Sequence, residues 1–382
     1  MRFYYHDFNF VMRCRAVVLI ASTVAIAGWW PAVAVAWNTD RLYGTRMRAR
    51  LTDVAVWRNR AYACWPRADA SQPVTLLELP WPETADEQPQ QPSSWTPSRP
   101  FYADQQKLYD CRRVQSAVAV DLDKLRGHLY VLDSGYDNVK CQPKIIVYDL
   151  KTYKCIQSVE LGGLNGSGLA TLVVDARPFK GETKVYVGDD RGGHITVFDP
   201  DRSVWYMVAL RIQNHGGTVI QQDYYGPEVD PDVAAECIAV FKRQSSVYLT
   251  SRRSHDLYTA SFKDLRNLTS YITPSIKNGD VLPVGLRVHW EGVKLGVSGG
   301  FYADIQGGLN YVYTRDFVAV RLSIMTGGVP VAAEDHKVLL QSYDLLPAVT
   351  KIFTDNTNYR QVWALNAMPN AENRHLVKIN TL

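Results

Sequence analysis

Short apolar strands alternate with polar turns along most of the chain. One unit recurs six times: a strand with a Tyr or Trp at its third position, a polar turn, and a second apolar strand. Such strands, rich in β-branched and aromatic residues and separated by Gly, Asp and Asn, are typical of all-β proteins. The first strands of the units span 60–65, 128–133, 184–189, 246–250, 309–313 and 361–365, and the second strands span 74–79, 145–148, 194–198, 256–260, 316–320 and 375–379.

Further apolar strands flank these pairs. Strands precede the pair at 117–121, 170–175, 237–241 and 349–353, and others follow it at 156–161 and 204–210. Four strands in each of six repeats predict an all-β fold, a six-bladed β-propeller of four-stranded blades. A pair of β-sandwiches is the alternative, but sandwiches do not repeat internally. The predicted blades lie near 50–110, 111–165, 166–225, 230–275, 285–330 and 340–382, and the chain ends on a third strand.

Two segments lie outside the repeat. The chain ends one strand short, so we expect the segment near Leu42 to complete the last blade. The stretch 80–100 is rich in Pro, Gln and Ser and is expected to form an extended surface loop within a single domain.

The first 36 residues have the pattern of a secretory signal peptide. Arg2, Arg13 and Arg15 form a basic region, 16–28 is apolar, and 34–36 is a small-x-small cleavage site. A membrane anchor is the alternative, but the apolar run is shorter than the roughly 20 residues that a span needs. We therefore expect a signal peptide at 1–36, a single propeller domain at 37–382, and a secreted, extracellular protein without a membrane attachment.

The charge of the chain changes this picture little. A formal net charge of +4 is mild for 382 residues, and Lys and Arg are scattered among Asp and Glu. This pattern predicts an ordinary solvated surface, so we expect no nucleic-acid partner. We also expect a monomer.

The cysteines predict one disulfide. Five of the six remain after loss of Cys14 with the signal peptide, so at least one thiol is left over. Cys111 precedes the first strand of the second blade and Cys141 lies between its second and third strands, so both belong at the same end of one blade. We predict a Cys111–Cys141 disulfide, with Cys155 as the weaker partner. The partners of Cys64, Cys155 and Cys237 stay open.

Two sequons are expected to carry N-linked glycans if the chain is secreted. They begin at Asn165 and Asn267.

Several motifs resemble the yellow / major royal jelly protein family. Leu129-Tyr-Val-Leu-Asp-Ser-Gly135, followed by Cys141-Gln-Pro-Lys-Ile-Ile-Val-Tyr-Asp-Leu150, is similar to two family segments. Tyr62-Ala-Cys-Trp-Pro-Arg67, Leu345-Leu-Pro347 and Val362-Trp-Ala-Leu-Asn366 resemble its early and last strands. The chain departs from the family in lacking a Cys at 123–126 and in having Asn366-Ala-Met368 where the family has Ser-Asn-Arg.

The resemblance implies a secreted protein with a role in cuticle pigmentation, in the binding of biogenic amines in saliva, or in nutrition. Some members of the family are dopachrome-converting enzymes.

The loops between second and third strands share one face of a propeller, where binding residues concentrate. We predict a ligand at the axial funnel on this face, with Asp133 and Asp189 as candidates for its positive group. Arg252 and Arg315 could balance those carboxylates. The family resemblance adds Asn366 and Met368 as candidate ligand contacts.

Two other interpretations of these loops stay open. Asp133 and Asp189 also fit ordinary turn chemistry, in which Asp caps its own backbone. Asp133, Asp189, Asp190 and Asn366 could supply oxygen ligands to Ca²⁺, although the set lacks Glu and we expect neither a metal nor a cofactor.

Three functions remain open on the sequence. The first is the binding of a small aromatic amine or catechol derivative at the axial funnel. The second is a dopachrome-type isomerase (a tautomerase), whose catalytic residues are unknown because no acid–base group stands out. The third is an extracellular structural or protein-interaction module.

Overall fold

A computed structural model describes residues 37, 50–81, 99–101, 106–136, 140–177, 182–212, 233–323, 331, 333–354, 361–368 and 375–380. All of these residues belong to the compact unit Ala34–Leu382. The described chain is mostly β-structure.

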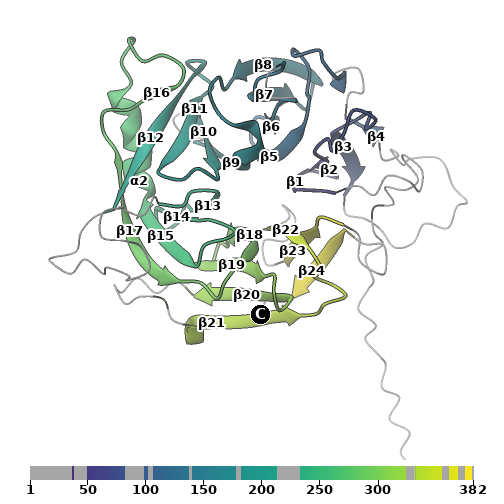
Figure 1. Cartoon of the computed structure of the whole chain (residues 1–382), viewed down its shortest axis with the longest axis vertical. Coiled ribbons are helices and arrows are strands. Elements are labelled where there is room, and N and C mark those ends of the chain that lie inside the picture. Colours follow the sequence, from purple (N-terminus) through teal and green to yellow (C-terminus); the bar gives the residue numbers. More distant parts are fainter. Residues whose placement is uncertain are drawn as a thin grey trace, which may run out of the picture. The chain divides into compact units, whose positions relative to one another are not determined.

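The described strands form six consecutive antiparallel meanders, which Figure 1 shows around a common centre. The first is β1 (Asp53–Trp57), β2 (Arg60–Cys64), β3 (Leu76–Pro80) and β4 (Arg99–Pro100), and the second is β5 (Ala117–Asp123), β6 (His128–Asp133), β7 (Lys144–Asp149) and β8 (Lys154–Glu160). The third is β9 (Leu169–Ala176), β10 (Thr183–Asp189), β11 (His194–Asp199) and β12 (Val204–Ile212), and the fourth is β13 (Cys237–Phe241), β14 (Ser246–Thr250), β15 (Asp256–Ser261) and β17 (Leu286–Val293). The fifth is β18 (Ser298–Ala303), β19 (Gly308–Tyr313), β20 (Val318–Ser323) and β21 (His336–Gln341), and the sixth is β22 (Val349–Thr354), β23 (Gln361–Asn366) and β24 (Leu376–Asn380).

The first strands of the meanders close a ring. β1 contacts β5, β5 contacts β9, β9 contacts β13, β13 contacts β18, β18 contacts β22, and β22 contacts β1. Sheets that repeat radially around a shared centre define a β-propeller. The chain is therefore a β-propeller with these six strands at its centre.

The aromatic position of the repeat explains how the sheets pack. The Tyr or Trp at the third position lies in the second strand of every meander and is buried at Tyr62, Tyr130, Tyr186, Tyr248, Tyr311 and Trp363. The larger hydrophobic clusters lie between neighbouring sheets, including one between the first and the last. Burial of these two-sided apolar sheets is the driving force for the radial arrangement.

The last and first sheets meet through aromatic side chains. The ring of Trp81 lies 5.2 Å from that of Trp363 and 6.2 Å from that of Trp37, measured between centroids. The Leu51 amide also donates to the Ala367 carbonyl at 2.8 Å. The predicted completion of the last sheet by the segment near Leu42 lies outside the described residues.

The fourth strands differ most from the sequence prediction. β17 begins near the predicted start of the fifth blade but pairs with β15, so it completes the fourth meander. The short helix α2 (Phe262–Asn267), capped by the Ser261 hydroxyl that accepts from the Asp264 amide, separates β15 from β17 and hides their pairing in the sequence. β21 likewise completes the fifth meander rather than opening the sixth.

The first sheet also contains a strand that the sequence did not predict. β4 lies at the end of the predicted loop 80–100 and pairs with β3 through Glu78 and Arg99. The remaining elements are 3₁₀ turns, η2 (Gly166–Gly168), η3 (Leu268–Tyr271) and η4 (Ala333–Asp335), and the two-residue strand β16 (Asp280–Val281).

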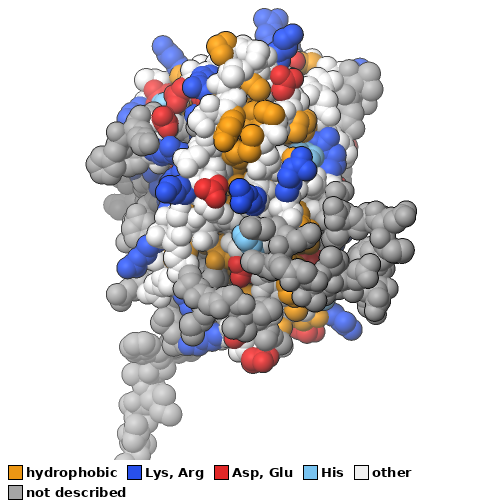
Figure 2. All heavy atoms as spheres, turned by 90° about the vertical axis from the view of Figure 1, so that its left-hand side faces the viewer, with side chains coloured by type: hydrophobic (Ala, Val, Ile, Leu, Met, Phe, Trp, Pro, Cys, Tyr) orange, Lys and Arg blue, Asp and Glu red, His pale blue; other side chains and the backbone are white. Residues whose placement is uncertain are grey.

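Two neighbouring sheets are joined along their outer strands. Residues 210–212 of β12 pair in parallel with 286–288 of β17, and β16 pairs with 206–207 of β12. Figure 2 shows the face formed by the elements on the left of Figure 1, where hydrophobic side chains lie among Lys and Arg. Tyr271 and Val281 belong to the exposed hydrophobic side chains of this region. No helix in the described part of the chain has the length and apolar character to cross a membrane.

Candidate functional site

A cavity of about 820 Å³ lies along the ring of first strands. Its lining comes from β1, β5, β9, β13, β18 and β22 and from the turns that follow three of them, together with Thr52 before β1 and Arg252 between β14 and β15. Those turns contribute Leu125 and Ile305, which are 65% and 50% exposed. The cavity therefore reaches the surface at the end of the propeller that carries the turns between first and second strands.

Aromatic side chains contribute to the lining of this cavity. They are Phe241 of β13, Phe301 and Tyr302 of β18, and Phe353 of β22. The Tyr302 hydroxyl lies 2.7 Å from the Thr354 hydroxyl. Burial raises the pKa of Tyr302, which keeps this hydroxyl protonated. Aromatic rings with a polar hydroxyl pair suit a flat ligand that carries its own hydroxyl groups.

A lysine and two aspartates lie in the same lining. The Lys351 ammonium of β22 contacts the Asp53 carboxylate of β1 at 2.9 Å. Burial lowers the pKa of Lys351, but the charges of Asp53 and Asp121 outweigh burial and leave the pKa above its ordinary value. Burial raises the pKa of Asp53, and Lys351 opposes that rise. The three groups therefore form one electrostatic cluster across three inner strands.

Asp121 is the carboxylate of this cluster without a direct ion pair among the described residues. Its oxygens accept from the Val174 amide at 2.7 Å and from the Leu122 amide at 2.8 Å. In their ionised forms, Asp53, Asp121 and Lys351 sum to one negative charge. This excess is local to the cluster, because the whole lining holds four Asp and five Lys or Arg residues. Such an excess in a partly water-excluded space attracts a cation.

Asp133, the first predicted ligand contact, is fully buried and lies outside this lining. Its carboxylate accepts from the amides of Gln115, Ser116 and Gly135 at 2.8–2.9 Å. It also contacts the Lys144 ammonium at 3.1 Å. The two side chains are 0% and 1% exposed, so this geometry favours turn chemistry over ligand binding.

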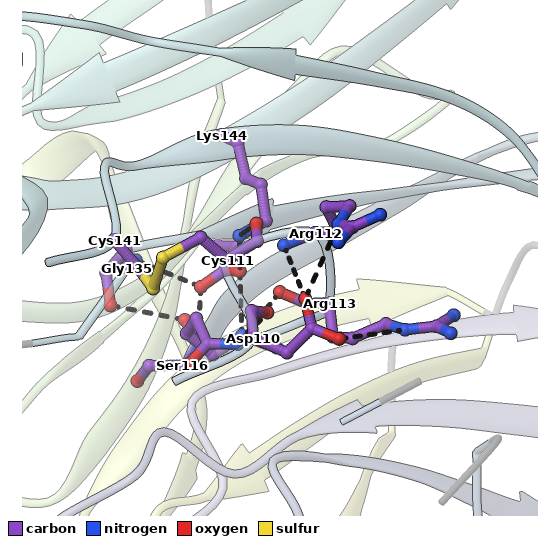
Figure 3. Close-up of polar contacts among 12 residues, drawn as sticks. Asp110, Cys111, Arg112, Arg113, Ser116, Gly135, Cys141 and Lys144 are labelled. Carbon is purple, nitrogen blue, oxygen red and sulfur yellow. Dashed lines mark hydrogen bonds and ion pairs between the residues drawn. A yellow bond between two sulfur atoms is a disulfide. The ribbon is translucent and has the colours of Figure 1, made fainter. Parts of the chain in front are cut away.

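A disulfide joins the two loops beside this pair. Cys111 and Cys141 form the predicted bond, with their Cα atoms 5.1 Å apart. Figure 3 shows the bond with Lys144, whose ammonium donates to the Cys111 carbonyl at 2.8 Å. Gly135 has a φ of +75°, and a Cβ there would collide with the Cys141 carbonyl. The disulfide and the buried ion pair thus fix one loop structure.

Asp189 is engaged in a similar way. It is 4% exposed and contacts Arg191 at 2.9 Å and His194 at 3.3 Å. Burial raises the pKa of Asp189, but the hydrogen bonds from His194 and Arg191 lower it to about 2. Asp189 therefore already has two partners in its own sheet, and it does not line the cavity.

The two predicted arginines differ in their position relative to the cavity. Arg252 lines the cavity and lies 3.4 Å from the Glu236 carboxylate. Arg315 is exposed in the turn between β19 and β20. Arg252 is thus the one predicted ligand contact that the described cavity lining includes.

The last predicted pair lies at the end of β23. Asn366 is fully buried, and its amide nitrogen donates to the Leu345 carbonyl at 2.9 Å. Met368 is 36% exposed. Neither residue belongs to the cavity lining, so the geometry gives Asn366 a role in holding the neighbouring loop.

Both predicted glycosylation residues are exposed. The Asn165 side chain caps η2 and accepts from the Ser167 hydroxyl of its own sequon at 2.9 Å. Asn267 ends α2. Among the described cysteines outside the disulfide, Cys64 and Cys237 are buried and Cys155 is exposed.

The Ca²⁺ interpretation finds no shared site. Asp133 and Asp189 each face a cation of their own sheet, as described above. Over the residues that the structure describes, no group of three or more His, Cys, Asp or Glu is gathered as a metal site.

Sequence reasoning missed the charged residues of the cavity. Asp53, Asp121 and Lys351 all lie in first strands that are otherwise mainly apolar. A charged residue inside an apolar inner strand was the available signal, because a buried charge is retained only with a partner.

The comparisons with known proteins agree with the motifs. The family model of major royal jelly proteins matches residues 115–377. Major royal jelly protein 3 of Apis mellifera is 26% identical over 171 residues, covering 42% of this chain and 31% of that protein. Major royal jelly protein 7 of the same species is 24% identical over 225 residues, covering 55% and 48%. The matched region thus spans less than half of either relative.

Some solved structures are similar at low identity. A luciferin-regenerating enzyme has a TM-score of 0.47 at 9% identity, covering 88% of this chain and 92% of that one. A streptogramin B lyase has a TM-score of 0.48 at 9% identity, covering 88% and 84%. Likenesses this distant say nothing about activity. The family model spans more than half of the sequence, and the chain belongs to the major royal jelly protein family.

Proposed function

We propose that this chain is a secreted, six-bladed propeller of four-stranded blades that binds a small aromatic amine or catechol derivative in its central cavity. The local negative charge of Asp121, which has no direct ion pair among the described residues, carries this proposal. Asp121 would receive the ligand's ammonium, and the rings of Phe301 and Tyr302 would pack against its aromatic group. Cation–π attraction and a charge-assisted hydrogen bond would both favour such a ligand.

In this proposal the ligand lies away from the loops that the sequence predicted to hold it. Asp133 and Asp189 each pair with a cation of their own blade and lie outside the cavity lining. Asp121 borders the cavity and has no direct ion pair among the described residues. Secretion is supported by the signal-peptide pattern, by family membership and by the disulfide, because disulfides persist in oxidising compartments. An experimental structure would test whether the last blade has a fourth strand.

Calorimetric titration with dopamine and with uncharged catechol tests the site. Asp121→Asn should weaken the binding of dopamine by about 1.5–3 kcal/mol, the range for a hydrogen bond to a charged group, and leave the binding of catechol nearly unchanged. Asp190→Asn is the matched control, because Asp190 is exposed in the loop that follows β10. Equal loss for both ligands, or no loss for either, contradicts the assignment of Asp121.

Dopachrome conversion is checked with the same proteins. If the wild type converts dopachrome and Asp121→Asn does not, the function of the cavity is catalysis rather than binding.

A further inference from the structure

Charge is divided along the central cavity. The lining around Asp53, Asp121 and Lys351 carries one excess negative charge, as described above. The turn between β13 and β14 adds Lys242 and Arg243 to the same lining, and both are exposed. The cavity therefore has an anionic cluster between its inner strands and cations at its opening. The two carboxylates of the lining at the opening, Asp123 and Asp304, already pair with Arg126 and Arg321.

The positive charge at the opening is not cancelled by its acidic neighbour. The Lys242 ammonium lies 3.7 Å from the Asp175 carboxylate, which is fully buried. Arg266 already bonds both oxygens of that carboxylate at 2.6 and 2.7 Å. Arg177 lies 3.7 Å from it and also bonds Glu182 at 3.0 Å. Three cations thus share two carboxylates, and Arg243 adds a further positive charge.

The two charged regions lie close together. Asp121 accepts from the amide of Val174 in β9, and Lys242 contacts the next residue of that strand, Asp175. Covalent geometry through these two residues places the Asp121 carboxylate and the Lys242 ammonium at most about 15 Å apart. One small molecule can therefore meet both groups.

We propose that the cavity favours an aromatic amine whose ring carries an oxyanion, a sulfate or phosphate ester, at the end away from the amine. The inference rests on the proposed function and specifies its ligand class. The ammonium meets Asp121, the ring packs against Phe301 and Tyr302, and the oxyanion faces Lys242 and Arg243. An amine without the oxyanion meets Asp121 but has no group to contact Lys242 and Arg243.

Calorimetry on the mature protein with dopamine, dopamine 3-O-sulfate and L-DOPA tests this. The sulfate ester is expected to bind about two- to fivefold more tightly than dopamine, the gain for an ion pair with exposed cations. Lys242→Gln/Arg243→Gln should remove that gain and leave the affinity for dopamine unchanged. Lys151→Gln/Lys154→Gln is the control, because it removes two exposed cations at the turn between β7 and β8.

The outcomes separate this inference from the proposed function. Binding of dopamine without preference for the ester overturns the inference alone, and absence of binding by both overturns both proposals. A preference that survives in Lys242→Gln/Arg243→Gln, or a stronger preference for L-DOPA, also overturns the inference. L-DOPA carries its anion beside the amine, so that result would place both charges in the interior.

Discussion

Two lysine–aspartate pairs in this propeller differ in their exposure to solvent. Lys144 and Asp133 are 1% and 0% exposed and are enclosed by a loop and a disulfide. Lys351 and Asp53 are 23% and 5% exposed and line the central cavity. The hydrogen-bond and ion-pair partners of the first pair lie within its own blade. The second has an additional carboxylate, Asp121, whose charge also acts on the lysine.

The difference shows why a conspicuous motif is not a binding site. Asp133 lies in the segment that most resembles the family, yet three amides and an ammonium fill its coordination. No sequence motif marks Asp121, but this residue borders the central cavity. A buried carboxylate that already has its own counter-ion, such as Asp133, has a structural role. A carboxylate that lines a cavity without its own counter-ion, such as Asp121, is available to a ligand.

The enclosed pair should be the more costly to break. Asp133→Asn leaves the Lys144 ammonium buried without its counter-charge, so we expect a loss of about 3–5 kcal/mol in the free energy of unfolding. Denaturant unfolding measures it. Asp190→Asn, the same change at an exposed position, should stay within about 0.5 kcal/mol of wild type. A loss as small in Asp133→Asn would mean that the enclosed pair contributes little.

The disulfide beside that pair should stabilise the fold by a similar amount. Cys111 and Cys141 are separated by 30 residues. The chain-entropy model then gives about 3–4 kcal/mol for the bond. Unfolding of Cys111→Ser/Cys141→Ser, compared with Cys155→Ser as the control, measures this contribution. Equal stability of the two variants would contradict it.

The buried lysine Lys294 sharpens the comparison because its hydrogen bonds go to uncharged groups. The Lys294 ammonium donates to the Ser251 carbonyl at 2.8 Å, the Gly296 carbonyl at 3.2 Å and the Ser298 hydroxyl at 2.8 Å. Burial lowers the pKa of Lys294 from 10.5 to about 8. Between these two values the unfolded chain holds more protons at this position, so stability rises with pH.

Unfolding of wild type and Lys294→Met from pH 7.5 to 10.5 tests this sign. The wild type should gain about 3 kcal/mol relative to the variant across that window, the energy of the pKa difference. Parallel curves for the two proteins would show that Lys294 keeps its ordinary pKa in the fold.

The cavity pair should show the smallest effect. Lys351→Met leaves Asp53 unpaired beside solvent, so we expect a loss of about 1–3 kcal/mol, less than for a fully enclosed pair. Asp53→Asn/Lys351→Met should recover part of it, because no unpaired charge remains. Chemical unfolding of the single and double variants measures the coupling between the two groups. A double variant less stable than both singles would contradict this account.

The repeated strands could be predicted because their signal is local. Tyr62, Tyr130 and the other third-position aromatics mark each second strand, and strand order alone places Cys111 near Cys141. β17 could not be predicted in its place, since the sequence does not show that α2 is an insertion before the last strand of a sheet. β4 follows a Pro-rich stretch and has only two residues.

The cavity could be predicted only in part. A propeller has an axial space, so a central site followed from the fold. Which end opens depends on the turns after the first strands, and these contain mixed polar and apolar residues such as Lys124 and Leu125. Asp53 and Lys351 lie far apart in the sequence, and their pairing appears only once the last sheet meets the first.

The parallel pairing of β12 with β17 has a consequence for assembly. The outer strand of a propeller blade normally presents unpaired backbone groups, to which a strand of another molecule can add. Here residues 210–212 and 286–288 satisfy each other, and β16 covers a further part of β12. This side of the molecule is thereby protected from strand addition, and self-association through strand exchange would have to use the outer strand of another sheet, such as β8 or β21.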